Sequence, residues 1–249
     1  LNFNGCYTIP WRCYYAKDLE NVMLAGRDIS TTRLGLASTR IIGCCAIGGE
    51  AVGIAAALCN KYACDPRELA PHVKELQQLI LKEDGFLPGF KNEDEKDLAL
   101  KAKITASSWE QGGEPEKVAN GISRKLGEEQ NGWVTKPGEC LIMKWDETKE
   151  IREIRLTFES NFAYPIRVTM APLRQAQQRN GVPEELVKDV KIELYREGKK
   201  TGEAFVKDNY QRLCSVGIGD VPADEIRVIP ESTNGAEQAV IHEIRVYAK

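Results

Sequence analysis

The 249-residue sequence predicts a multidomain α+β protein in which an α/β segment, a strand plus two helices, precedes an antiparallel β-sandwich of the jelly-roll type. Three observations support this prediction. An apolar, glycine-rich stretch with helical periodicity begins near residue 38. A charge-rich run at residues 91–97 indicates an exposed domain boundary. From residue 104 onward, short alternating segments are separated by Gly, Pro and Asn, as in antiparallel sandwiches.

The first element is a short apolar run, Val22 to Ala25, which Gly26 closes. Such a run suits a buried strand of an α/β sheet. A glycine at the carboxyl end of a strand lets a ligand approach the backbone, and open α/β sheets bind ligands at that edge. We therefore expect a ligand site where this strand ends.

The second element is a long helix that is expected to begin near Ser38, which suits the N-cap position. Each of its internal glycines would cost an isolated helix about 1 kcal/mol relative to alanine. Close packing must offset this cost, so we expect the helix to lie against another backbone or a flat ligand. The residues at helical spacing are Gly43, Ile47, Glu50 or Ala51, Ile54 and Leu58, with Gly48, Gly49 and Gly53 between them.

The stretch from Ile41 to Cys59 is also long enough to be tested as a membrane span, because about 20 apolar residues cross a bilayer. It contains a single charged residue, Glu50. It is rich in Gly, Ala and Cys rather than Leu, Ile and Phe, and a carboxylate near its middle is costly in lipid. We therefore favour a buried helix and expect no membrane span.

A second, amphipathic helix is expected after Pro66, which suits a first helical turn, and it should reach about Lys82. Asp84 and Gly85 then end it. We divide the chain into residues 1–90, a linker at 91–103, and the sandwich at 104–249.

The formal charge of -3 and the isoelectric point near 5.7 give no reason to expect nucleic acid or an anionic membrane as a partner. The eight cysteines include no Cys-x-x-Cys pair, and with two histidines no zinc spacing is present. We interpret most of them as small buried hydrophobic residues. In an oxidising compartment, Cys6 with Cys13 or Cys59 with Cys64 could pair, and the sequence does not decide between them.

The order of motifs over the first 90 residues resembles the C-terminal, flavin-contacting segment of a family of FAD-dependent oxidoreductases. The likeness consists of YTIPWR at residues 7–12, AGR at 25–27, GLASTRIIGCCAIGGEAVGIAAALC at 35–59 and LPGF at 87–90. The resemblance implies FAD as the cofactor of the full-length protein. It also implies a dinucleotide fingerprint near that protein's N-terminus.

The same resemblance implies which residues contact cofactor and substrate. A polar side chain after Gly26 could bind a ribityl hydroxyl, and whether Arg27 or Asp28 does so stays open. A helix start offers unpaired N–H groups to negative charge on a reduced isoalloxazine. The implied cofactor residues are Gly26, Arg27, Asp28, Ser38, Thr39 and Arg40, and the implied substrate residues are Arg12 and Tyr14. The alternatives are that Ser38 only caps a helix and that Arg12 is a surface ion-pair residue beside core aromatics.

The fingerprint itself is absent from these residues, and the sequence starts with Leu1 rather than Met. We interpret this start as a cut inside a longer protein. The missing N-terminal nucleotide-binding part is then the expected partner of residues 1–90. Without it, we expect the chain to lack FAD and to be inactive.

Residues 102–249 resemble a galactose-binding-like domain of the discoidin or coagulation-factor C type. The likeness consists of ITASSW at 104–109, VANGISR at 118–124, NGWVT at 131–135 and HEIRVYA at 242–248. The resemblance implies ligand binding by loops at one end of the sandwich, with a glycan as one class of ligand. It also implies a structural calcium ion in many members, but Asn120 stands where an aspartate is frequent, so we predict no metal site. Trp109, Trp133 and Trp145 could stack on a sugar, although core packing is the favoured interpretation.

Two functions follow. In the first, the chain is the C-terminal portion of an FAD-dependent oxidoreductase, and the sandwich is an accessory module that binds carbohydrate or positions a small-molecule substrate. In the second, the chain is a non-enzymatic glycan-binding or interaction module. No catalytic base can be assigned. A bacterial periplasmic or extracellular location is favoured over a cytoplasmic one.

Overall fold

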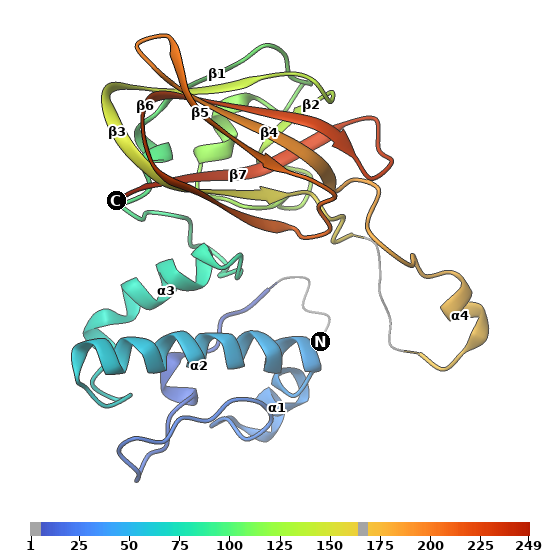
Figure 1. The fold of residues 1–249 in the computed structure, drawn as a ribbon. Helices are drawn as coiled ribbons and strands as arrows, with labels where there is room; N and C mark the ends of the chain where they lie inside the picture. The colour runs from blue at the N-terminus through green and yellow to red at the C-terminus, as the bar shows by residue number, and fades with distance from the viewer. Residues whose placement is uncertain (1–5, 164–168) are drawn as a thin grey trace. The chain divides into compact units, whose positions relative to one another are not determined.

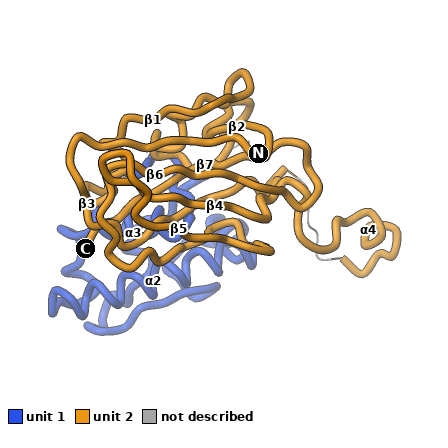
Figure 2. The backbone as a smooth tube through the Cα atoms, turned by 45° about the horizontal axis from the view of Figure 1, so that its top comes forward, with its two compact units in different colours: residues 1–92 blue, residues 93–249 orange. Residues whose placement is uncertain are grey.

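The computed structural model describes residues 6–163 and 169–249, and Figure 1 shows its helices and strands. The chain forms two compact units, residues 1–92 and residues 93–249, which Figure 2 colours separately. The expected order of a helical segment followed by an antiparallel β-domain is confirmed.

Unit 1 is helical in its described part. A 3-10 turn, η1 (Trp11–Cys13), precedes α1 (Arg33–Thr39) and the long α2 (Ile42–Tyr62). A second 3-10 turn, η2 (Ala70–His72), leads into α3 (Val73–Lys82), which runs alongside the C-terminal part of α2 in Figure 1. The small core of the unit lies between these two helices, and its buried members are Ala55, Leu58, Cys59, Leu69, Leu76 and Ile80.

The strand expected at Val22 to Ala25 is reduced to a single antiparallel bridge between Tyr15 and Met23. The backbone of Leu24 donates to Tyr14 and that of Ala16 to Val22, so the segment is paired only with residues just before it. A strand of an α/β sheet needs neighbouring strands on its open side, and residues 6–92 supply none.

The long helix also differs from the prediction. It begins at Ile42 rather than Ser38, and Ser38 and Thr39 belong to the separate helix α1. Ile41 breaks the two helices apart with an extended backbone, φ -71° and ψ 140°. The apolar periodicity continues across this break, which is why the sequence pattern does not reveal it.

Unit 2 is an antiparallel sandwich. Its strands are β1 (Lys103–Ala106), β2 (Trp133–Thr135), β3 (Leu141–Phe158), β4 (Val187–Arg196), β5 (Lys199–Val206), β6 (Leu213–Thr233) and β7 (Ala239–Ala248). They pair in the order β2-β7-β3-β6-β4-β5, and β1 also pairs with β3. The short helices are η3 (Leu98–Lys101), η4 (Pro115–Ala119) and α4 (Pro172–Ala176).

The long strands β3 and β6 connect the two layers of the sandwich. The pairing of β3 with β6 shifts register between Lys144 and Lys149. Before this irregularity β3 pairs with β1, and after it β3 pairs with β7. The same two strands thus contribute to both layers, and their inward side chains enclose one apolar core that includes Trp133, Leu141, Met143, Ile154, Phe158 and Ile244.

The strand ends gather most of the connecting loops at one end of the sandwich. Thr157 at the end of β3 pairs with Leu213 at the start of β6, and Phe158 pairs with Ile241 near the start of β7. The described loop segments that leave or enter these positions, residues 120–132, 159–163, 179–186, 207–212 and 234–238, therefore meet there. We call this region the loop end.

Candidate functional site

The first candidate site is the surface that α1 and α2 present in unit 1. Thr32 caps α1 by accepting a hydrogen bond from the backbone of Gly35 at 3.1 Å. The N-cap of α2 is Ile41, which has no side chain that could cap the helix. The expectation that Ser38 is the N-cap is therefore wrong, and the first N–H groups of α2 receive no side-chain cap.

The side chains of Ser38 and Thr39 are bonded within unit 1, whereas Arg40 is exposed. The Ser38 hydroxyl lies 2.5 Å from the hydroxyl of Tyr7. Thr39 is buried, and its hydroxyl donates to the carbonyl of Gly35 at 3.2 Å. Of the three residues expected at the helix opening, Arg40 is the one whose side chain faces solvent next to the start of α2.

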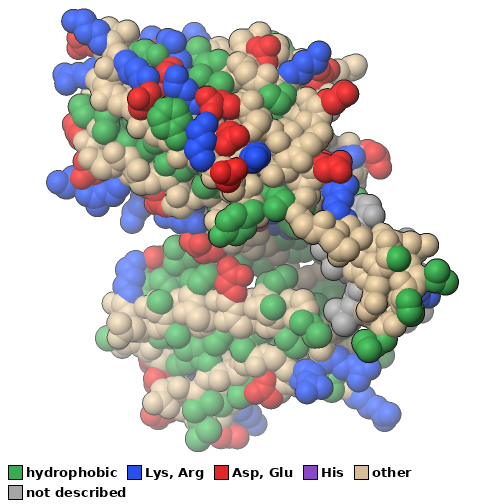
Figure 3. All heavy atoms as spheres, turned by 45° about the vertical axis from the view of Figure 1, so that its right-hand side comes forward, with side chains coloured by type: hydrophobic (Ala, Val, Ile, Leu, Met, Phe, Trp, Pro, Cys, Tyr) green, Lys and Arg blue, Asp and Glu red, His purple; other side chains and the backbone are tan. Residues whose placement is uncertain are grey.

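Much of α2 is open although its side chains are apolar. Ile42 is 79% exposed and Ile47 is 50% exposed. A Cβ atom added to Gly43, Gly49 or Gly53 would meet nothing within 4 Å. The lower part of Figure 3 shows hydrophobic side chains, together with backbone and other uncharged side chains, over much of this unit's visible surface. The expected burial of the helix is thus found only where it packs on α3 and where Tyr14 covers Gly48.

By length and hydropathy, α2 is the one helix of the described chain that could cross a membrane, and 22% of its apolar window is buried. Length and composition do not distinguish such a helix from one that another protein surface covers. Glu50 near its middle is the one charged residue between Ile42 and Asn60. Burial and the charges of Glu83 and Asp84 raise the pKa of Glu50 above its usual value.

The turn after Met23 contains a backbone conformation that favours glycine. Gly26 has φ +113°, a conformation that residues with a Cβ rarely adopt. Arg27 and Asp28 follow with exposed side chains, and Ile29 is buried and anchors the turn. All three of the expected ligand residues at this turn are accessible.

The two expected substrate residues, Arg12 and Tyr14, differ in solvent exposure. Arg12 is exposed in η1. Tyr14 is 7% exposed, and its ring covers Gly48 so closely that a Cβ there would lie 2.9 Å from it. Burial, with contributions from Cys13, Cys44, Tyr7 and Cys45, raises the pKa of Tyr14 to about 12. Tyr14 is therefore positioned as a packing residue of α2.

This packing makes a stability prediction with a matched control. Gly48→Val should destabilise unit 1 by about 1–3 kcal/mol, because the added atoms collide with Tyr14. Gly53→Ala on the same helix meets open space and should raise stability by up to about 1 kcal/mol through helix propensity. Urea unfolding of the two variants measures both changes. Equal effects of the two substitutions would contradict the role of Gly48.

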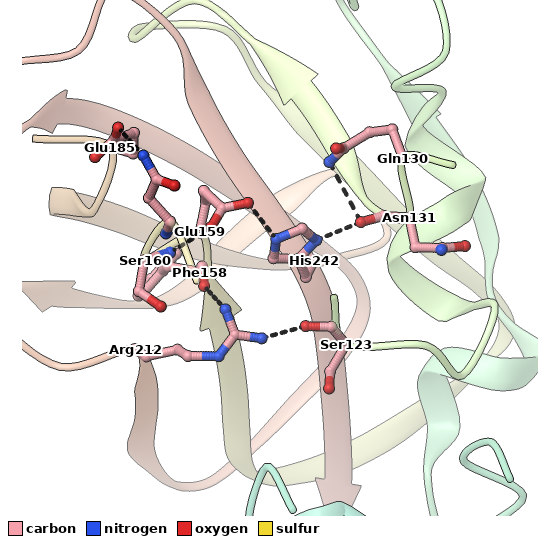
Figure 4. A network of polar contacts seen from close by, with 10 residues as sticks. Ser123, Gln130, Asn131, Phe158, Glu159, Ser160, Glu185, Arg212 and His242 are labelled. Carbon is pink, nitrogen blue, oxygen red and sulfur yellow. Dashed lines mark hydrogen bonds and ion pairs between the residues drawn. The ribbon is translucent and has the colours of Figure 1, made fainter. Parts of the chain in front are cut away.

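The second candidate site is the loop end of unit 2, where a buried polar network joins three loops (Figure 4). His242 on β7 is 1% exposed, and one ring nitrogen pairs with the backbone carbonyl of Asn131. Its Nε2 lies 3.0 Å from a carboxylate oxygen of Glu159. The other Glu159 oxygen accepts from the backbones of Ser160 and Asn161. The network fixes the start of the 159–186 loop against the 120–132 loop.

Glu159 is ionised in this setting. Burial alone would raise its pKa, but the hydrogen bond and charge of His242, the Asn161 backbone and Arg212 outweigh burial and lower it to about 2. A carboxylate with a depressed pKa stabilises the fold above its unfolded pKa, near 4.5, and loses that contribution as the pH falls toward 2.

We therefore expect the stability of the sandwich to fall between about pH 4.5 and pH 2, and Glu159→Gln should flatten this decline. At neutral pH the same variant should lose about 1–2 kcal/mol, allowing for partial solvent screening. Denaturant titrations across this pH range measure the effect. Glu147→Gln is the control. Glu147 forms a surface ion pair with Lys149, so its substitution should change the stability of the sandwich little across this pH range. A profile for Glu159→Gln parallel to the unsubstituted chain would contradict this account.

A second connection at the loop end is Arg212. Its guanidinium donates to the carbonyl of Phe158 at 2.5 Å and to that of Ser123. Its Cζ also lies 4.4 Å from the ring centroid of Phe162, and that of Arg124 lies 5.2 Å from the same ring. Phe162 remains 62% exposed. An aromatic ring is thus presented to solvent beside two guanidinium groups, of which that of Arg212 is fixed by backbone carbonyls.

Two further aromatic side chains are exposed at this end. Tyr210 is 71% exposed in the 207–212 loop, and Trp109 is 50% exposed just before the residue that pairs with β2. The other two tryptophans of the sandwich behave as expected for core residues. Trp133 and Trp145 are 0% and 7% exposed, and their indole nitrogens donate to the carbonyls of Ser108 and Leu98, each at 2.9 Å.

Sequence reasoning did not identify Glu159, Phe162, Tyr210 or Arg212. These residues come from two loops, the one that follows β3 and the one that precedes β6, and only the register of β3, β6 and β7 brings them to one end. The sequence placed His242 in the segment HEIRVYA, but it did not indicate that the side chain is buried. Asn120 uses its side chain within the loops, accepting from Ile122 and donating to Asn131 at 2.7 Å. In the described chain, no three His, Cys, Asp or Glu side chains cluster to hold a metal.

Comparison with known proteins agrees with the sequence interpretation of the first part of the chain. Residues 2–80 match a family model described as FAD dependent oxidoreductase, so the expected resemblance of this segment is confirmed. No curated protein matches the chain.

Solved structures similar to the chain include a Streptococcus pneumoniae fucose binding module, with 12% identity, a TM-score of 0.46, and coverage of 64% of this chain and 99% of that one. Another is the lectin domain of lectinolysin complexed with Lewis B antigen, with 12% identity, a TM-score of 0.48, and coverage of 62% and 98%. A third is the family 32 module from C. perfringens NanJ in complex with galactose, with 15% identity, a TM-score of 0.43, and coverage of 61% and 98%. At these scores the likeness carries no inference about the ligand of this chain.

Proposed function

We propose that the chain is the C-terminal portion of an FAD-dependent oxidoreductase, in which residues 1–92 complete the flavin site and the sandwich binds carbohydrate as an accessory module. The observation that carries the flavin part is the open, glycine-lined face of α2. An apolar helix face of this size is costly to leave in water and calls for a partner. The family match over residues 2–80 supports a flavoprotein as the source of that partner.

The residues present fit a flat cofactor. Gly43, Gly49 and Gly53 leave the backbone of α2 accessible, since nothing lies within 4 Å of their missing side chains. Gly26, with its positive φ, also exposes backbone at the preceding turn, where the Asp28 carboxylate is the neighbour, 3.5 Å from the position of a Cβ. A flat ring system can approach bare backbone more closely than it can approach side chains.

Polar groups for orientation lie on the same unit. The uncapped N–H groups at the start of α2 form the positive end of a 21-residue helix, which favours negative charge on a bound ring. Arg40 is exposed beside that helix start, and Arg27 and Asp28 are exposed at the Gly26 turn. In this proposal these three side chains bind and orient the cofactor, and the exposed Arg12 contacts the substrate. Bound FAD would supply two-electron redox chemistry.

The remainder of the flavin site, a nucleotide-binding fold, would lie outside these 249 residues, which contain no Gly-x-Gly-x-x-Gly segment. The test is flavin absorbance near about 450 nm in the full-length protein and in this chain. Colour in the full-length protein and none in the chain is expected. No colour in either would leave a non-enzymatic binding module as the function.

The carbohydrate part of the proposal rests on the loop end. Exposed Phe162, Tyr210 and Trp109 offer apolar ring faces, and sugar rings have apolar faces of matching size. Arg124 and Arg212 carry hydrogen-bond donors beside Phe162. A glycan array probed with the whole chain tests this part separately. Binding to a defined set of sugars is expected, and a blank array would reject it.

A further inference from the structure

The C-terminal end of α2 places two thiols together, a feature that is independent of the proposed flavin and carbohydrate sites. Ala63 ends the helix in the left-handed conformation, with φ 48° and ψ 48°. The Cys64 backbone then donates to the carbonyl of Cys59 at 3.0 Å, and that of Ala63 donates to Asn60 at 3.4 Å. This pair of bonds defines a Schellman motif, which characteristically brings the side chains of its two outer residues into contact. Here those residues are Cys59 and Cys64.

The packing of the two side chains also indicates that Cys59 and Cys64 are in contact. Cys59 is 8% exposed, and the half-buried Cys64 packs against the cluster to which Cys59 belongs. Burial raises the pKa of the Cys59 thiol to about 11, and the contact and hydrogen bond with Cys64 add to this effect. A backbone bond of this type holds two Cα atoms within the range of about 4.4–6.8 Å that disulfides span.

The thiols are also accessible to a small reagent. Both line an open pocket of about 460 Å³ at the end of α2, which Asn21, Met23 and Asp65 help to form. By contrast, the neighbouring thiols on α2 have other contacts: the Cys44 sulfur lies 3.8 Å from the Tyr7 hydroxyl, and the Cys45 thiol donates to the Thr39 carbonyl. Cys59 and Cys64 thus combine mutual contact with a shared opening.

We propose that Cys59 and Cys64 are a redox modification site, at which a small-molecule disulfide oxidises them to an intramolecular disulfide. The more exposed Cys64 thiolate attacks one sulfur of the reagent and releases one reagent thiol. Cys59 then loses its proton and attacks the Cys64 sulfur, which releases the second reagent thiol. Two protein thiols are oxidised, and one reagent disulfide is reduced to two thiols.

The disulfide would tie the last turn of α2 to the connection that leads into η2 and α3. Because the closed loop is short, its effect on stability should be modest, a rise of a few degrees in the unfolding midpoint of unit 1. Asp65 and Glu68 also line the pocket, so an uncharged reagent such as 2-hydroxyethyl disulfide is the appropriate probe.

The experiment treats the whole chain with 2-hydroxyethyl disulfide, blocks the remaining thiols and digests with trypsin without reduction. Lys61 lies between the two cysteines, so cleavage after it separates peptide 41–61 from peptide 62–67 unless a disulfide joins them. We expect the joined pair, which reduction splits. The joined pair should persist in a Cys44→Ser, Cys45→Ser variant and disappear in Cys59→Ala.

Three results would overturn the proposal. The first is the absence of the joined peptides from the treated chain. The second is their persistence in Cys59→Ala, which would assign the bond to Cys44 or Cys45. The third is a Cys64 that stays bonded to the reagent while Cys59 remains a free thiol. The proposed flavin and carbohydrate sites would be unaffected by any of these results.

Discussion

Replacing Gly53 by leucine in the full-length flavoprotein is expected to lower flavin retention by about tenfold or more. The side chain would enter the surface that α2 offers to its partner, and overpacking of this kind costs about 1–3 kcal/mol, with about 1.4 kcal/mol per tenfold change in affinity. Retention is measured as the ratio of flavin absorbance to protein absorbance after gel filtration.

The control for this experiment is the chain of 249 residues. Because nothing lies within 4 Å of a Cβ at Gly53, Gly53→Leu should not destabilise unit 1 there, and its helix propensity should raise stability by up to about 1 kcal/mol, as for Gly53→Ala. If flavin retention falls while the 249-residue chain stays stable, the substitution blocks the surface of α2 rather than damaging the helix. Full flavin retention in the full-length Gly53→Leu protein would contradict the proposed position of the cofactor.

Removing the exposed rings at the loop end is expected to produce the second large effect. Phe162→Ala and Tyr210→Ala should each weaken binding to the sugars identified on the array by about fivefold or more, since a central aromatic contact contributes more than 1 kcal/mol. Both side chains are mostly solvent-exposed, so their removal should cost little stability. Calorimetric titration with the identified sugar measures the change.

Phe90→Ala supplies the matched control for these substitutions. Phe90 is 42% exposed and belongs to unit 1, so it is not part of the sandwich or its loops. Its removal should leave sugar binding unchanged. If Phe90→Ala weakened binding as much as Phe162→Ala, the site would not lie at the loop end.

The sequence predicted the elements whose signals are local. The alternation in β3 and β7 identified the sandwich, because inward residues such as Ile154 and Ile244 recur at every second position. The glycines of α2 indicated a helix that must be covered by another backbone or a flat ligand, because small residues on most sides leave no solvated polar stripe. Both inferences use spacing within one segment.

The features that the sequence did not predict depend on distant contacts. Thr32 rather than Ser38 caps a helix, since Ser38 lies within α1 and α2 begins only at Ile42. The Ser38 hydroxyl instead pairs with that of Tyr7, 31 residues earlier. Glu159 and His242 are 83 residues apart and meet because β3 and β7 pair in a particular register. No periodicity within a single segment reveals such a pairing.

The central claim is that the exposed face of α2 is covered in the full-length protein by flavin and its nucleotide-binding fold. Hydroxyl-radical footprinting measures the solvent exposure of single side chains, and it can be applied to the full-length protein and to this chain. Ile42 and Ile47, 79% and 50% exposed here, should become strongly protected, whereas Leu19, 58% exposed and outside the helix, should be labelled equally in both. Equal labelling of Ile42 and Ile47 in the two proteins would contradict the account.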